Sequence, residues 1–260
     1  MDWLSELVRG LLRRRETAGL LIGVITLIVI FIPKPLFAIV LLFISYIFGY
    51  ELELITGKRN LRWVSSIAFL FSLISVFLGL LVAFVSSLIY GYLEVAKRGY
   101  YSHATYHAFT TAFLSAVYGG VLPYSLVYIK EHSHYLLLAL VLSVWAADTF
   151  AYYIGKKIGK TRLVREISPN KTLEGFLGGI AAGVFVGIFV SQLLKIEHFN
   201  PLFWFVVVKL SILGDLFESF LKRSFGVKDS SNLLGSHGGF LDRFDALLLA
   251  SLGVAGLLKV

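Results

Sequence analysis

The chain has 260 residues, of which 57% are hydrophobic and 15% charged, with a net charge of +8 and no cysteine. A soluble fold could not cover so much apolar surface, and the missing thiols exclude disulfides, thiolate metal sites and cysteine nucleophiles. These values predict an all-α, polytopic integral membrane helix bundle. In such a protein the basic excess reflects the bias of positive charge toward the cytoplasmic side, so no nucleic-acid partner is expected.

Residues 1–16 form a basic stretch with apolar residues at helical spacing from Trp3 to Leu12. The pattern predicts an interfacial amphipathic helix lying on an anionic membrane surface. An ordinary basic flank that only orients the first span explains it equally well. A cleavable signal peptide is not expected, because the following apolar run has no small-residue cleavage site.

Apolar segments follow in chain order and predict about nine transmembrane helices, with residues 17–130 as the N-terminal transmembrane part and residues 134–260 as the catalytic part. They are Thr17–Ile32, Pro35–Tyr50, Val64–Leu78, Gly79–Val95, Tyr106–Ile129, His134–Ile154, Thr172–Leu194, Pro201–Leu221 and Leu241–Leu258. We count Val64–Val95 as two helices, because this places most of the Lys and Arg residues on one side, which is then the cytoplasmic side.

One group of polar residues begins in the sixth segment. There Asp148 interrupts an apolar helix, which indicates an interior polar site. Ser168 and Pro169 break the chain after this helix. Lys171 stands directly before the seventh helix, whose N-terminus is a natural anion site, so we expect Lys171 to bind phosphate. The lysines between these positions are attributed to membrane topology: Lys156, Lys157 and Lys160.

Charged residues gather most densely in Ser211–Asp245. On the eighth predicted helix, Asp215, Glu218 and Lys222 fall within about 60° of one another, while the other faces are apolar. Charges at membrane depth are costly and normally face a bundle interior or an aqueous cavity. A salt-bridge network that merely joins two helices is the alternative, but the density of charge favours a functional site.

Carboxylates also share a face at the start of the ninth predicted helix, where Asp242 and Asp245 are three residues apart. Two facing pairs of carboxylates repel each other unless a cation lies between them. Oxygen ligands without cysteine or a histidine cluster favour Mg²⁺. The predicted metal ligands are Asp215, Glu218, Asp242 and Asp245, with the number of ions, one or two, left open.

Basic and glycine residues surround these acids. The basic residues are typical of groups that hold phosphates and offset the charge that develops in phosphoryl transfer: Lys222, Arg223, Lys228 and Arg243. Gly238 and Gly239 allow backbone N–H groups to approach an anion. For His237 two roles stay open, a structural one and a role in binding phosphate or protonating the leaving group.

Taken together, these residues resemble the signature of phosphatidate cytidylyltransferases, also called CDP-diacylglycerol synthases. The downstream part of the signature is Ser219, Lys222-Arg223, Lys228-Asp229, His237-Gly238-Gly239 and Asp242-Arg243-Phe244-Asp245. The upstream part is Trp145, Asp148, Ala151-Tyr152, Gly155-Lys156, Gly159-Lys160, Ser168-Pro169, Lys171-Thr172 and Glu174-Gly175. The resemblance covers about Leu142 to Leu248. The first half of the chain is similar only in hydropathy and at Glu51.

The resemblance implies a Mg²⁺-dependent enzyme of phospholipid biosynthesis that joins CTP and phosphatidic acid to give CDP-diacylglycerol and pyrophosphate. It implies that Asp215 and Asp242 hold the metal. The residues assigned by it to catalysis are Lys222, Arg223, Lys228, Asp229, His237 and Arg243. Those assigned to substrate binding are Asp148, Ser168, Lys171, Ser219, Gly238 and Gly239. We expect a multi-pass protein of the plasma or inner membrane with its active site facing the cytoplasm, and a homodimer is among the expected assemblies.

Two other functions are compatible with membrane carboxylates. One is another membrane phospho-transferase that acts on a nucleotide or a polyprenol phosphate, although the DGxxAR motif of CDP-alcohol phosphotransferases does not occur in this chain. The other is an ion-coupled transporter, in which polar helix breaks would occur in paired halves. Here the breaks gather in the second half, which disfavours transport.

Overall fold

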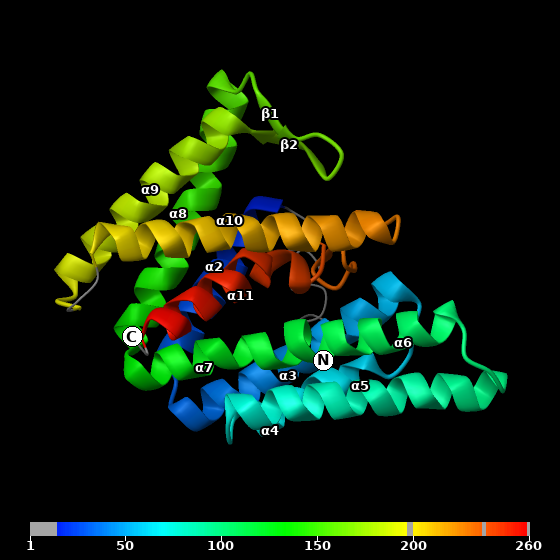
Figure 1. Ribbon diagram of the computed structural model, residues 1–260. Helices are drawn as coiled ribbons and strands as arrows, with labels where there is room; N and C mark the ends of the chain where they lie inside the picture. Colours follow the sequence, from blue (N-terminus) through cyan, green and yellow to red (C-terminus); the bar gives the residue numbers. More distant parts are fainter. Residues whose placement is uncertain (1–14, 197–199, 236–237, 259–260) are drawn as a thin grey trace, which may run out of the picture. The chain divides into compact units, whose positions relative to one another are not determined.

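The computed structural model describes residues 15–196, 200–235 and 238–258, and these residues form α-helices joined by short loops and one small hairpin (Figure 1). Most of the helix predicted for residues 1–16 lies outside the described residues. His237 also lies outside them. The chain divides into two compact units. The first contains the residues up to Val127 together with Asp229–Asp242, and the second contains Tyr128–Lys228 and the residues from Arg243 onward.

The first unit is built from consecutive apolar helices. They are α2 (Arg15–Phe31), α3 (Lys34–Thr56), α4 (Leu61–Ser72), α5 (Val76–Arg98), α6 (His103–Leu114), a π-helical turn (Ser115–Val121) and the start of α7 (Leu122–His132). The helix α4 packs against α3, α5 and the π-helical turn, and α5 packs against α6. Small residues allow the closest of these contacts, since Ser65 Oγ lies 2.8 Å from Ser115 Oγ at the crossing of α4 and the turn.

Two helices, rather than one long helix, occupy the predicted segment Val64–Val95. The helix α4 ends at Ser72, and α5 begins at Val76 after a short turn. The sequence predicted two helices here with a division between Leu78 and Gly79, whereas the structure divides them earlier and places Gly79 within α5. With 12 residues, α4 is about 18 Å long, which is shorter than the roughly 30 Å hydrocarbon core of a bilayer.

Five helices in the described part of the chain are long and apolar enough to cross a membrane: Lys34–Thr56, Val76–Lys97, His103–His132, His134–Ile158 and Leu173–Leu193. Large apolar side chains on these helices point outward, for example Phe77 and Phe185, which are 76% and 68% exposed. Such surfaces are stable only against lipid. The chain is therefore a multi-pass membrane helix bundle, as its composition predicted.

The second unit is built on two long helices that lie side by side, α8 (His134–Ile158) and α9 (Leu173–Leu193) (Figure 1). Glycines on α9 let the two backbones approach closely, and Ser143 Oγ donates a hydrogen bond to the carbonyl oxygen of Gly183 at 2.9 Å. The helix α10 (Pro201–Ser224) packs on both through a core that includes Ala147 and Val208.

A small antiparallel hairpin connects α8 and α9, where the sequence predicted a polar loop with a break at Ser168. Its strands are β1 (Arg162–Val164) and β2 (Ser168–Thr172), with Arg162 opposite Thr172. The strand ends at Thr172, whose side chain accepts a hydrogen bond from Gly175 N at 3.2 Å and caps α9. The hairpin therefore holds Arg162 and Lys171 in fixed positions beside the helix start.

The helix α11 (Leu241–Leu257) packs against α10 in the second unit. Gly214 makes this possible, because a Cβ atom at that position would overlap the carbonyl oxygen of Asp245. The close approach brings Asp215, the neighbour of Gly214, near Asp245. At the far end of α11, Gly256 has no atom within 4 Å of the corresponding Cβ position.

Gly214→Ala should therefore lower stability, because the added methyl group has no space, and overpacking costs about 1–3 kcal/mol. Gly256→Ala is the matched control. It adds the same methyl group to the same pair of helices without a clash, and should be neutral or stabilising by up to about 1 kcal/mol. Thermal unfolding midpoints in one detergent compare the two. Equal midpoints would show that α10 and α11 are not in close contact at Gly214.

Candidate functional site

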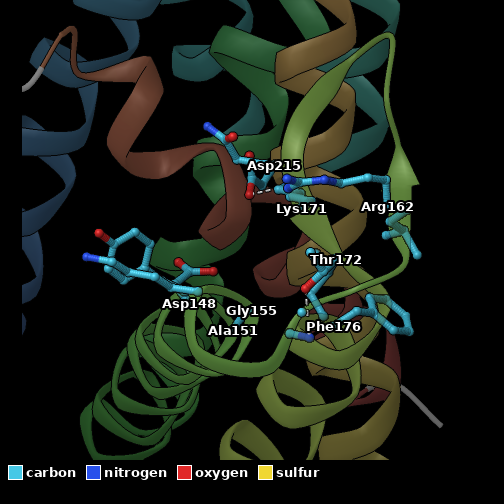
Figure 2. Close-up of a pocket in the computed structure, with 15 residues that line it drawn as sticks. Asp148, Ala151, Gly155, Arg162, Lys171, Thr172, Phe176 and Asp215 are labelled. Carbon is cyan, nitrogen blue, oxygen red and sulfur yellow. Dashed lines mark hydrogen bonds and ion pairs between the residues drawn. The ribbon is translucent and has the colours of Figure 1, made fainter.

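A pocket of about 530 Å³ opens in the second unit between α8, α9, α10 and the hairpin (Figure 2). This volume is in the range of small-molecule sites. Its charged and polar lining comes from Asp148, Lys156, Arg162, Asn170, Lys171, Thr172 and Asp215, and its apolar lining includes Tyr152, Leu163, Phe176 and Ile212. Cations thus outnumber acids in a pocket that also has an apolar wall.

Lys171 and Asp215 form an ion pair across this pocket. Figure 2 shows Lys171 and Arg162 extending from the hairpin toward Asp215 on α10. The Oγ atom of Ser219 lies 3.5 Å from Asp215 Oδ1, one helical turn further along α10. The sequence assigned Lys171 and Asp215 to binding a phosphate and a metal, and the structure brings the two residues together.

Glu218 and Lys222 form a second ion pair on α10, at 2.5 Å. Glu218 is fully buried and Lys222 is 9% exposed, so each charge compensates the other in a region that water does not reach. Both lie outside the pocket lining. Lys222 shares the helical face predicted for it, and there it forms this internal pair with Glu218.

The acids of the second unit are close enough to interact electrostatically. Asp245 on α11 is repelled by Asp215, Glu218 and Asp148. Asp148 on α8 is repelled by Asp215 and attracted by Lys171 and by Arg243. Three acids on three different helices, Asp148, Asp215 and Asp245, are therefore near enough to repel one another, and Lys171 and Arg243 act on the same region.

The remaining basic residues predicted for the site lie at its margin or outside it. Arg223 donates from Nη1 to the carbonyl oxygen of Val227 at 2.9 Å and from Nε to that of Ile167 at 3.4 Å, which joins the end of α10 to the hairpin. Lys228 is exposed. Ser168 lies in β2 and does not line the pocket.

The signature residues Gly238, Gly239 and Asp242 belong to the first unit. The Oδ2 atom of Asp242 accepts hydrogen bonds from Gly239 N at 2.7 Å and from Ser230 N at 3.0 Å. Ser230 Oγ lies 2.9 Å from the same oxygen. Gly238 has a φ of 77°, which favours glycine. Asp229 is exposed at the start of this loop.

A carboxylate that the sequence assigned to no role, Glu51 on α3, also contacts this loop. Further residues line the pocket although the sequence analysis did not assign them to the site. Lys156 was attributed to topology, and Arg162 and Asn170 lay in a supposed loop. The strands that carry Arg162 and Asn170 have three and five residues, which is too short for a reliable alternation of polar and apolar positions.

The chemistry of the acidic residues suits a hard divalent cation, because carboxylate oxygens are the ligands that Mg²⁺ prefers and the clustered acids of the second unit repel one another. Among the residues that the structure describes, no three His, Asp or Glu side chains converge as a ready-made metal site. Asp215 and Asp242 lie in different units. The metal site shared between them therefore stays a prediction.

The fold and the pocket define the class of the protein as a polytopic membrane helix bundle with a charged pocket. Residues 13–260 match the Cytidylyltransferase family. The phosphatidate cytidylyltransferase of Aquifex aeolicus is 40% identical over 92% of this chain and 88% of its own length. The enzymes of the same name from Staphylococcus aureus and Bacillus subtilis are 46% and 38% identical over 46% and 52% of this chain and the same shares of their own lengths. The chain belongs to the cytidylyltransferase family.

Arg162→Gln should weaken the binding of inorganic pyrophosphate about tenfold, since a hydrogen bond to a charged group contributes about 1.5–3 kcal/mol and Arg162 is partly in water. Arg165→Gln is the matched control, because Arg165 carries the same charge in the same hairpin but does not line the pocket. Titration calorimetry in detergent measures both. Equal weakening in the two variants would mean that only the overall charge of the hairpin matters.

Proposed function

We propose that this protein is a phosphatidate cytidylyltransferase that converts CTP and phosphatidic acid to CDP-diacylglycerol and pyrophosphate. The observation that carries the proposal is the pocket of the second unit, in a chain of this family. Its cations, Arg162, Lys171 and Lys156, suit a phosphate group. The apolar wall at Phe176 and Ile212 suits a substrate that is partly lipid.

In the reaction, an oxygen of the lipid phosphate attacks the α-phosphorus of CTP. A new P–O bond forms there, and the bond from the α-phosphorus to the bridging oxygen of pyrophosphate breaks. The attacking oxygen is already anionic, so no strong general base is needed. Both reactants are polyanions, and the protein's main task is to bring them together and neutralise their repulsion. Lys171 and Arg162 are placed to do this at the pocket, and Arg243 adds positive charge near Asp148.

The carboxylates proposed to hold Mg²⁺ are Asp215, Glu218, Asp242 and Asp245, and a second ion is compatible with their number. When bound, Mg²⁺ supplies further neutralisation of the CTP phosphates. Lys171, paired with Asp215, is the group whose partner would change when the metal and nucleotide bind. Lys222 keeps Glu218 neutralised within the helix.

The purified protein, given phosphatidic acid, labelled CTP and Mg²⁺, should release pyrophosphate and form a labelled lipid. Product formed equally well from any nucleotide, or none from CTP, would overturn the proposal. Label transfer to a polyprenol phosphate instead would identify another membrane phospho-transferase. Ion flux through reconstituted vesicles without any transfer would identify a transporter.

Asp215→Asn and Asp242→Asn should each reduce turnover to background in this assay, because each removes a negative charge at the proposed metal site and leaves the side-chain volume unchanged. Glu166→Gln, in the exposed turn of the hairpin, is a control for charge removal and should leave turnover within twofold. Turnover like that of the wild type in either Asp variant would remove that residue from the proposed metal site.

We also propose that about nine helices cross the membrane and that the pocket faces the cytoplasm, where Mg²⁺ and CTP are found. The basic residues around the hairpin support this, since they follow the positive-inside rule: Lys156, Lys157, Lys160, Arg162, Arg165 and Lys171. A homodimer remains an expected assembly.

The chain has no cysteine, so single introduced thiols can report the side on which a residue lies. Arg165→Cys should react with a membrane-impermeant maleimide in inverted membrane vesicles but not in intact cells. Lys195→Cys, at the opposite end of α9, is the matched control and should show the reverse. Labelling of both thiols from the same side would contradict the proposed topology.

A further inference from the structure

Glu51 is a fully buried acid on α3, and among the described residues its carboxylate is hydrogen-bonded to the loop that ends at Asp242. Its Oε1 atom accepts hydrogen bonds from Phe240 N at 2.8 Å and from Ser231 Oγ at 2.6 Å. Its Oε2 atom accepts one from Leu241 N at 2.6 Å and lies 3.2 Å from Ser230 Oγ. All of these residues belong to the first unit.

Two of these donors are backbone groups at the start of α11, Phe240 N and Leu241 N. The first N–H groups of a helix have no partner within the helix and carry partial positive charge. A buried carboxylate is an effective acceptor for them. Glu51 therefore determines where α11 begins, and Asp242 is the second residue of that helix.

The same loop atoms connect Glu51 to Asp242. Ser230 Oγ lies within hydrogen-bonding distance of both carboxylates, at 3.2 Å from Glu51 Oε2 and 2.9 Å from Asp242 Oδ2, and its single proton can serve only one of them at a time. Gly239 donates its N–H to Asp242 Oδ2. A side chain on Gly239 would collide with Glu51 Oε1. The two acids thus hold one loop from both sides.

We propose that Glu51 is a positioning residue for the reaction: it holds the loop and the start of α11 so that the Asp242 carboxylate keeps its orientation. The proposal rests on the role proposed above for Asp242. It places a residue of the N-terminal half of the chain in the support of the signature motif. Glu51 itself does not touch substrate in this arrangement.

The role requires a carboxylate rather than an amide. Each oxygen of Glu51 accepts from one backbone N–H, Oε1 from Phe240 and Oε2 from Leu241. Whichever way a glutamine at position 51 turned, its NH₂ group would face one of these N–H groups, which cannot act as an acceptor. Glu51→Gln therefore breaks the connection to the loop with almost no change in volume.

Glu53→Gln is the matched control. Glu53 is also a buried acid, two residues further along α3, and both of its oxygens accept from Arg62. An amide there would likewise face a donor in either orientation, but the partner is on α4 and not in the loop. The control therefore reproduces the loss of a buried charge and its effect on folding.

In the full-length protein, Glu51→Gln should increase hydrogen–deuterium exchange at the amides of Phe240 and Leu241. It should also lower kcat about 10- to 100-fold, which is the usual effect of removing a residue that orients a metal ligand. Glu53→Gln should leave exchange at these amides unchanged and keep kcat within about twofold of the wild-type value. Its thermal unfolding midpoint should be comparable to that of Glu51→Gln. Either unchanged exchange in Glu51→Gln, or an equal loss of kcat in both variants, would overturn the proposal.

Asp242→Asn separates this proposal from the function itself. If Asp242→Asn is inactive while Glu51→Gln turns over like the wild type, the role of Glu51 is wrong and the function stands. If Asp242→Asn is fully active, Asp242 is not part of the catalytic site. The positioning role of Glu51 is then also wrong, even if the exchange data show that Glu51 stabilises the loop. If both are impaired and only Glu51→Gln also loosens the loop, the positioning role is supported.

Discussion

A charged side chain inside a membrane helix bundle is stable only when a partner neutralises it or several donors surround it, and this requirement shapes both units of the protein. On α10, Glu218 is paired with Lys222 within the helix. On α3, Glu53 is bound by Arg62, whose guanidinium also lies 4.5 Å from the ring centre of Tyr50. Glu51 is surrounded by donors from the signature loop. The contacts of Glu53 and Glu51 join α3 to other elements, to α4 and to the signature loop.

The same requirement explains why the reactive surface is built on rigid elements. Asp215 stands on α10 beside a glycine that brings α11 into contact, and Lys171 stands at the end of a strand that is closed by the cap at Thr172. Residues held in this way keep their positions while ligands exchange, which is what a site for two mutually repelling polyanions needs. The cations and the acids assigned to the metal thus remain close together, with Lys171 paired with Asp215 and Lys222 paired with Glu218.

Much of the architecture could be predicted from the sequence, because lipid imposes a strong and simple pattern on it. The predicted apolar segments are largely helical in the structure, although the division predicted between Leu78 and Gly79 lies earlier, at residues 73–75. The hairpin was missed, since its strands have only three and five residues and carry no periodic signal. Arg162 was missed with it, because its position in the pocket depends on pairing with β2 and not on any local motif.

The sequence by itself determined that this is a multi-pass membrane protein of the cytidylyltransferase family, and which acids and bases of its second half belong to the signature. These conclusions depend on composition, hydropathy and local spacing, which are properties of the chain in one dimension. Only the tertiary structure revealed the partners of charges that are distant in sequence: Lys171 with Asp215, and Glu51 with amides of the signature loop. Glu51 and Leu241 are 190 positions apart, and no local pattern encodes such a contact, because it forms only when packing brings a buried acid to donors that water cannot reach.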